Sequence, residues 1–185
     1  MNIVDFLFPK QCIFCSRVGY DICPNCLRGL VSTLPTCCIC KKINNNYWTH
    51  RECLNPPIQC FTGWYISKEL RKSLRRKESV GIYSPHSFLL EILIKRLGIE
   101  KTLDRYSVRE IASEDVITKR VNRNLAKELR RNNPNKKNYL YIGEYIDKEC
   151  DIKKLIKRLP KGEPFTCKIV CLFDTTQSRD LCRVH

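Results

Sequence analysis

The sequence predicts an α/β fold preceded by a cysteine-rich N-terminal module. Two observations support this prediction. Eight of the 13 cysteines lie between residues 12 and 53. Beyond residue 60, apolar strand-like runs alternate with amphipathic helix-like runs, which is typical of a layered α/β domain. Pro56 and Pro57 separate the two regions, so we place the domains at residues 1–57 and 58–185.

The N-terminal module contains two C-x2-C pairs between Pro9 and Cys26, then a third pair followed by an H-x2-C pair. Four thiolate or imidazole ligands complete a tetrahedral zinc shell. The expected ligands are Cys12, Cys15, Cys23 and Cys26 for one ion and Cys37, Cys40, His50 and Cys53 for another. Interleaved pairs, or a single loaded site, are compatible with the same spacing. Metal binding would supply folding free energy that so small a core lacks.

The other cysteines do not fit this spacing. Cys38 lies beside Cys37 and could replace a ligand, but it is too close to Cys40 for a C-x2-C pair. The cysteines expected to be core thiols are Cys60, Cys150, Cys167, Cys171 and Cys182. Because protein ligands fill both expected zinc shells, the module is expected to be a scaffold rather than a catalyst.

The elements after residue 58 follow from composition and periodicity. Residues 59–67 are aromatic and β-branched, which predicts a strand, and residues 68–77 carry a narrow apolar stripe on a basic helix. A helix is expected from Ser84 to Gly98, because Pro follows at the first helical position and Gly ends the run. Its expected core face is Phe88, Leu89, Ile92, Leu93 and Leu97.

The C-terminal half continues the alternation. Residues 115–131 form an expected basic helix with Val121, Leu125 and Leu129 at a spacing of four. A strand is expected at residues 139–146, a short basic helix at 151–162, and at 167–174 an apolar run of the kind buried in a parallel sheet.

The chain is strongly basic and shows no export signal. It has 34 Lys and Arg against 19 Asp and Glu, a formal net charge of +15. This surplus favours polyanionic partners, although a solvated basic surface is the simpler alternative. The first ten residues lack a basic n-region, and the apolar run from Phe88 to Ile94 is too short to span a bilayer. We therefore expect a cytoplasmic protein without membrane insertion. In the reducing cytoplasm, paired cysteines bind metal more often than they form disulfides.

The stretch "DFLFPKQCIFC…ICPNCLRGL…CCIC…HREC" resembles the N-terminal double zinc ribbon of ComF-type proteins, which are competence-associated and phosphoribosyltransferase-like. The positions of Phe8-Pro9 and Leu34-Pro35 match the family pattern. The segment "FTGWYISKELRKSLRRKES" resembles the family's aromatic strand and basic helix. The resemblance is specific over residues 1–60, fair to about residue 100, and weak beyond.

The resemblance implies a type I phosphoribosyltransferase-like parallel sheet with flanking helices, here shortened. In that family a loop of two acids, two threonines and a glycine binds phosphoribosyl pyrophosphate with Mg²⁺. This chain keeps only Asp174, Thr175 and Thr176 of the loop, without the second acid or the glycine. Elsewhere we find no Ser-His-Asp set, Walker loop or carboxylate pair with credible spacing, and His86 lies at a helix start.

Three functions follow as hypotheses. The first is a role in natural transformation, in which the protein binds single-stranded DNA and works with other competence proteins. The residues expected to contact DNA are Arg71, Lys72, Arg75, Arg76, Arg120 and Arg123. Trp64, Tyr65 or Tyr47 could offer stacking surfaces, although aromatic residues on strands usually pack inward. The second is an active Mg²⁺-dependent phosphoribosyltransferase, and the third is a zinc-ribbon adaptor that binds another protein.

Overall fold

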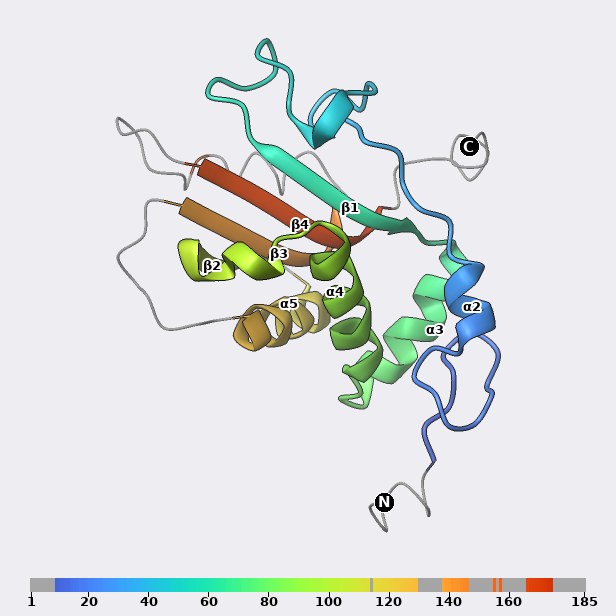
Figure 1. Cartoon of the computed structure of the whole chain (residues 1–185). Coiled ribbons are helices and arrows are strands. Elements are labelled where there is room, and N and C mark those ends of the chain that lie inside the picture. Colours follow the sequence, from blue (N-terminus) through green and yellow to red (C-terminus); the bar gives the residue numbers. More distant parts are fainter. Residues whose placement is uncertain are drawn as a thin grey trace.

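A computed structural model describes residues 9–113, 115–129, 138–146, 155, 157 and 166–174 of the chain (Figure 1). The helices are α2 (Pro24–Arg28), α3 (Lys68–Ser79), α4 (Ser84–Arg96) and α5 (Val116–Leu129). The strands are β1 (Gln59–Tyr65), β2 (Ser107–Glu110), β3 (Asn138–Ile146) and β4 (Thr166–Asp174). Two short 3-10 helices, η1 (Asn45–Tyr47) and η2 (Glu100–Arg105), complete these elements.

The four strands form one parallel sheet in the order β1-β4-β3-β2. The parallel sheet predicted from the apolar run at residues 167–174 is therefore confirmed, with that run at β4 in the interior of the sheet. β4 pairs with β1 on one side and with β3 on the other, so its backbone donors and acceptors are used on both edges.

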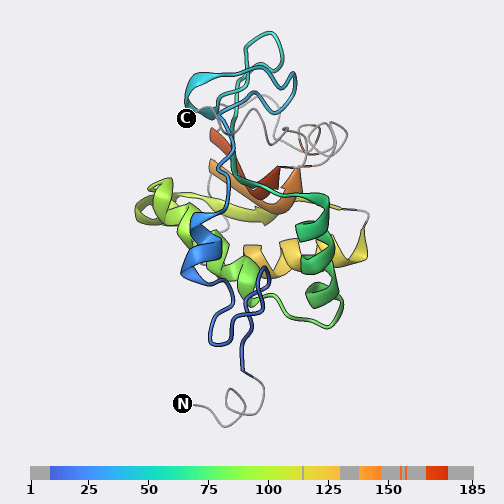
Figure 2. The same ribbon diagram turned by 90° about the vertical axis from the view of Figure 1, so that its right-hand side faces the viewer.

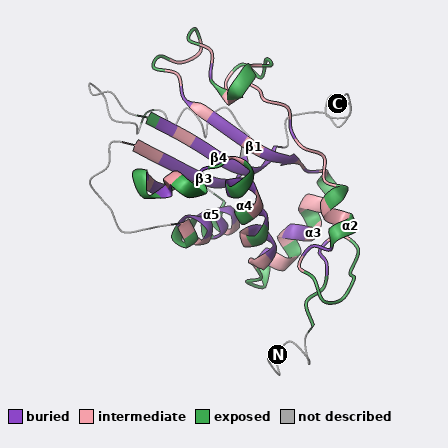
Figure 3. Ribbon diagram, in the orientation of Figure 1, coloured by how far each residue is buried: buried purple, intermediate pink, exposed green. Residues whose placement is uncertain are grey.

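The two faces of the sheet are covered differently. Helices α3, α4 and α5 all lie on one face (Figures 1 and 2). Along β4, Val170 and Leu172 join the apolar cluster that contains these helices, whereas Cys167, Ile169 and Cys171 belong to a second cluster. This alternation follows from the two-residue period of a strand as far as Leu172, after which Phe173 joins the first cluster as well. Strands β1 and β4 are buried along most of their length (Figure 3).

The cysteine-rich region runs along the outer edge of β1. Ser32 pairs with Trp64, and Trp48 pairs with Gln59, both in antiparallel bridges. The first cysteine segment then lies against α3 and α4, and the second lies at the opposite end of β1 (Figures 1 and 2). Covering β1 in this way protects an edge strand from pairing with other chains.

Polar contacts attach the first cysteine segment to the helices. The Ser73 hydroxyl donates to the Ile13 carbonyl at 3.0 Å, and the Lys77 ammonium donates to the Gln11 carbonyl at 3.0 Å. The side chains of Ile13 and Ile22 are also buried in the cluster that contains the helices. The segment is therefore fixed to α3 by both apolar and polar contacts.

The expected core face of α4 was partly wrong. Leu89 and Leu93 are buried as expected, but Phe88 is 37% exposed, and Leu90 and Ile94 are buried in its place. The sequence there is apolar on nearly every side of the helix, so periodicity does not specify which side faces the sheet. Strand β2 was not anticipated at all, because it is only four residues long.

Several expectations lie outside the described residues. They are the helix at 151–162, apart from Leu155 and Lys157, together with Cys150, Cys182, Thr175 and Thr176. Within the part of the chain that the structure describes, no helix combines the length and the apolar character needed to cross a membrane.

Candidate metal centres

The first cysteine pair is held in a tight backbone knuckle. The Cys12 N–H donates to the Arg17 carbonyl at 2.9 Å, and the Ser16 N–H donates back to the Cys12 carbonyl at 2.8 Å. Gln11 and Val18 close the loop with an antiparallel bridge. Ser16 adopts a φ of 61°, in the left-handed region that lets the chain reverse within so few residues.

The third cysteine pair repeats this knuckle 25 residues later. The Cys37 N–H donates to the Lys42 carbonyl at 2.9 Å, and the Lys41 N–H donates to the Cys37 carbonyl at 2.9 Å. Thr36 and Ile43 form the closing bridge, and Lys41 has a φ of 62°. The same contacts occur at the same offsets from the leading cysteine, so the C-x2-C pattern specifies the local backbone in both places.

The pairs that face the knuckles differ. Cys23 is the residue immediately before α2, and Cys26 lies within that helix. At the second site, His50 and Cys53 lie on a turn in which the Cys53 N–H donates to the His50 carbonyl at 3.0 Å. The first site is therefore closed by a short helix and the second by an isolated turn.

In each group the candidate ligand atoms lie close together. The sets are Cys12, Cys15, Cys23 and Cys26, and Cys37, Cys40, His50 and Cys53; one ligand atom from each residue lies within 4.8 Å of the others in its set. The Cys15 and Cys23 Sγ atoms are 3.6 Å apart, and His50 Nδ1 is 3.2 Å from Cys40 Sγ. A tetrahedral ion with Zn–S bonds of about 2.3 Å places its sulfurs about 3.8 Å apart, so both groups can hold zinc.

The electrostatics of the first group favour a bound cation. Burial acts against ionisation of Cys12, but backbone N–H groups from Cys23 and from its own turn lower its pKa to about 6. A backbone N–H of Cys26 likewise lowers the pKa of Cys23. Burial and the neighbouring sulfurs raise the pKa of Cys26, because a further negative charge would be repelled. A divalent cation removes that repulsion and lets all four thiolates form.

The second group behaves in the same way. Burial opposes ionisation of Cys37, but the backbone N–H groups of Cys40 and His50 help to lower its pKa to about 6. Burial, followed by the sulfurs of Cys40 and Cys37, raises the pKa of Cys53 to about 12. The backbone of each knuckle thus favours the thiolate form of its first cysteine, Cys12 or Cys37. The last cysteine of each group, Cys26 or Cys53, needs a bound cation to ionise.

The geometry also decides between the pairings that the spacing leaves open. The pairs combine consecutively rather than in an interleaved order. Cys38 is outside both groups; it is buried in the apolar cluster that contains Cys60, whose pKa its thiol helps to raise. Cys60, Cys167 and Cys171 are buried, as expected for core thiols.

The residues expected to bind phosphate and DNA are not all accessible. Asp174 ends β4 and is only 2% exposed. The guanidinium group of Arg71 lies 4.4 Å from the centre of the Tyr145 ring, and Arg75 donates to Asp115 at 2.8 Å and to Thr118 at 2.6 Å. Both arginines therefore stabilise the fold. The remaining expected DNA contacts, which are exposed on α3 and α5, are Lys72, Arg76, Arg120 and Arg123.

An open groove of about 850 Å³ lies beside the second cysteine group. Tyr47 and Trp48 provide aromatic side chains, and Arg96 and Lys168 provide positive charge. Three amide side chains complete its polar lining, those of Asn45, Asn46 and Gln59. Tyr47 is among the stacking residues expected from the sequence, whereas Trp48, Arg96 and Lys168 were missed because only the fold brings them together.

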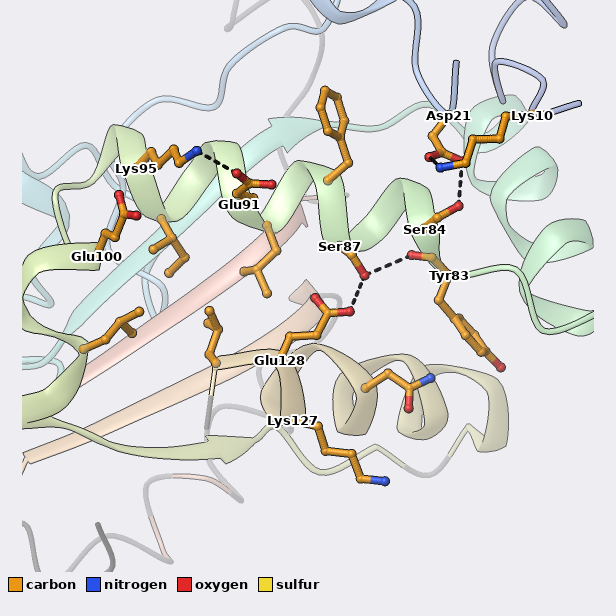
Figure 4. A pocket seen from close by; sticks show the side chains of 16 residues that line it. Lys10, Asp21, Tyr83, Ser84, Ser87, Glu91, Lys95, Glu100, Lys127 and Glu128 are labelled. Atoms are coloured by element: carbon orange, nitrogen blue, oxygen red, sulfur yellow. Dashed lines mark hydrogen bonds and ion pairs between the residues drawn. The ribbon is translucent and has the colours of Figure 1, made fainter. Parts of the chain in front are cut away.

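A second groove, of about 890 Å³, lies along α4 and α5 (Figure 4). Its polar side chains largely bind one another. Ser84 donates to Asp21, Ser87 donates to Glu128, and Lys95 is paired with Glu91 at 2.6 Å. Polar groups are also engaged in the groove beside Trp48, where Arg96 donates to Ser32 at 2.9 Å and Lys168 lies 5.5 Å from the centre of the Tyr106 ring. The groove beside Trp48 differs in combining these cations with the aromatic residues Tyr47 and Trp48.

The structure also brings together a buried cluster of Glu78, His86 and Glu144, which was not expected from the sequence. Burial raises the pKa of Glu144, and the two carboxylates raise the pKa of His86 although burial acts in the opposite direction. The sequence feature that could have indicated this cluster is Glu144, an isolated acid in the apolar run of β3. Nothing in the spacing connects it to Glu78 and His86.

Comparison with family models, with curated proteins and with solved structures finds no match for this chain. The class of protein therefore follows from the fold and the residues of this chain alone. It is a parallel α/β domain with two candidate metal-ligand groups in the segment that runs along the edge of its sheet. One group has four cysteines, the other has three cysteines and a histidine, and each can bind zinc.

Proposed function

We propose that this chain is a zinc-binding protein of the ComF type that binds single-stranded DNA during DNA uptake. The observation that carries the proposal is the groove beside the second cysteine group. It combines the aromatic side chains of Tyr47 and Trp48 with the positive charges of Arg96 and Lys168. Proteins that bind single strands without strong sequence preference combine stacking surfaces with cations in this way.

The aromatic rim of this groove is held in a strained conformation. Asn46 and Tyr47 have φ values of 64° and 62°, which is unusual for a residue as bulky as tyrosine. The Tyr47 ring packs on Phe61, with ring centroids 5.0 Å apart. Strain that the surrounding structure maintains is common at binding sites, and this supports assigning the function to the groove.

The second cysteine group gives zinc a specific role in this proposal. Tyr47 and Trp48 lie on the loop between two of its candidate ligands, Cys40 and His50. A metal ion at this site would fix both ends of the loop and so hold the aromatic rim in place. DNA binding is therefore expected to depend on metal, although no metal ligand contacts the DNA.

The electrostatic part of the proposal rests on the whole chain. A net charge of +15 attracts a polyanion at long range. The exposed side chains of Lys72, Arg76, Arg120 and Arg123 add to this attraction outside the groove. Such contacts position DNA without reading its sequence, so we expect little sequence preference.

The test is a titration of the zinc-loaded full chain with fluorescently labelled single-stranded DNA at several salt concentrations. We expect affinity to fall steeply with salt. Trp48→Ala should weaken binding by about 1–3 kcal/mol, the usual contribution of one stacked base. Phe88→Ala is the matched control, because Phe88 is 37% exposed and Trp48 is 36% exposed, but Phe88 lines the groove along α4.

Two results would contradict the proposal. Absent or salt-independent DNA binding would favour the protein-interaction adaptor. Saturable binding of phosphoribosyl pyrophosphate with Mg²⁺, measured in parallel, would favour the phosphoribosyltransferase. We expect no such binding, because the Asp174 side chain is buried at the end of β4.

A further inference from the structure

The buried cluster of Glu78, His86 and Glu144 joins three separate elements. Glu78 lies in the last turn of α3, His86 in the first turn of α4, and Glu144 on β3. All three side chains are at most 1% exposed. The cluster lies apart in sequence from both cysteine groups, and it is independent of the function proposed above.

The three side chains converge on one point. His86 Nε2 lies 3.0 Å from Glu78 Oε1 and 3.2 Å from Glu144 Oε1. One ligand atom from each residue lies within 4.8 Å of the others. Nitrogen and oxygen ligands at about 2.0–2.2 Å from a tetrahedral zinc ion are about 3.3–3.6 Å apart, so small shifts would accommodate an ion. A single N–H on Nε2, by contrast, cannot point directly at both carboxylates.

Hydrogen bonds within the protein leave this cluster incomplete. Among the residues that the structure describes, Glu144 Oε2 and His86 Nδ1 are buried without a hydrogen-bond partner. The Tyr145 hydroxyl is buried as well, on a residue that is only 6% exposed. The Tyr145 ring lies 5.6 Å from the Phe173 ring, and the Phe173 ring lies 6.4 Å from the His86 ring, so Tyr145 is a near neighbour of the cluster. Buried polar atoms without partners require an explanation, and an ion bound between them supplies one.

The charges also favour a dication. Glu78 and Glu144 contribute two negative charges in a buried site, and buried charges require compensation. Arg75 lies 3.4 Å from Glu78 but is closer to Asp115, at 2.8 Å. The positive charge of Arg75 also lies near Glu144 and Glu78. A divalent ion bound to neutral His86 would take the place of the proton that the two carboxylates otherwise favour on the imidazole.

We propose that Glu78, His86 and Glu144 bind a third divalent transition-metal ion, with zinc as the preferred ion. Two carboxylates and one imidazole are a suitable donor set for zinc and leave a fourth position for water. The ion would link the end of α3 and the start of α4 to strand β3 of the sheet that these helices cover. This site contains no sulfur, which distinguishes it chemically from the two cysteine groups.

The decisive measurement is the number of zinc ions bound to the full chain by native mass spectrometry. We expect three ions in the unmodified protein and two in Glu144→Gln. Glu91→Gln is the control, because Glu91 is an exposed carboxylate on α4 and should leave the count at three. A count of two in the unmodified protein overturns the proposal, whether or not the variants fold.

Cobalt substitution provides a second readout. Cobalt at the cysteine groups gives sulfur-to-metal charge-transfer absorption, whereas cobalt bound only by nitrogen and oxygen gives none. We expect a third equivalent of Co²⁺ to add visible absorption without adding charge-transfer intensity. If the third equivalent adds neither, or if His86→Gln folds and still binds three ions, the assignment of these ligands is wrong.

Discussion

The two knuckles at Cys12 and Cys37 have the same backbone conformation. Different structures supply the remaining ligands of each site, and different contacts attach each segment to the α/β domain. The first faces a short helix that supplies Cys23 and Cys26. The second faces a turn that supplies His50 and Cys53. The C-x2-C spacing therefore specifies the local chain reversal. The remaining ligands of each site depend on where its segment meets the α/β domain.

The attachments differ in kind. The first segment is fixed to α3 through Ile13 and by the hydroxyl of Ser73. The second is tied to the start of β1, where the Ile58 N–H donates to the Thr49 hydroxyl at 2.9 Å and the Thr49 N–H donates to the Ile58 carbonyl at 2.9 Å. Cys38 also packs in the cluster behind the sheet. Both segments keep contacts to the α/β domain without metal, but those of the second include hydrogen bonds to the sheet itself. Loss of metal from the second site should therefore disturb its segment less than loss from the first.

The largest expected effect comes from Cys23→Ala. Cys23 is a candidate ligand, its N–H donates to Cys12 Sγ at 3.3 Å, and it precedes α2. Structural zinc contributes about 10–16 kcal/mol of apparent binding free energy, so we expect one ion to be lost and residues 9–30 to unfold locally. Zinc counting and hydrogen exchange would measure both effects, and exchange protection in β4 should persist.

Cys38→Ala is the matched control for this prediction. Cys38 is a buried cysteine within a knuckle, but it lies outside both ligand groups. We expect the variant to keep both cysteine-bound ions. Loss of an ion from Cys38→Ala, or a full complement in Cys23→Ala, would show that the ligands are assigned incorrectly.

Replacing His50 should have a smaller effect. His50→Ala removes one of four candidate ligands, whereas the Thr49 contacts to β1 remain. We expect zinc affinity at the second site to fall by more than the roughly 10–100-fold that loss of a hydrogen-bond partner of a ligand costs, measured by competition with a chelator. His50→Cys should restore the affinity, because it makes the second ligand set equivalent to the first. Equal loss in both variants would mean that His50 acts through packing alone.

These sites were predictable because their chemistry is local. The C-x2-C and H-x2-C spacings identify the candidate ligands, although only the structure selects the consecutive pairing, and the apolar run at β4 indicates a buried parallel strand. The Glu78–His86–Glu144 cluster and the groove at Trp48 were not predictable, because each joins residues far apart in the chain. The core face of α4 was only partly predicted, since apolar residues surround the helix and only packing selects the buried side.

The smallest expected effect concerns the backbone that the knuckles share. Ser16 and Lys41 occupy equivalent positions and have φ values of 61° and 62°. Glycine has no side-chain penalty in this region, although it also makes the unfolded chain more flexible. Ser16→Gly and Lys41→Gly should each raise the free energy of unfolding of the zinc-loaded protein by about 0.5–1 kcal/mol, measured in urea. If one substitution raised the free energy of unfolding and the other lowered it, the two knuckles would share their hydrogen bonds but differ in backbone strain.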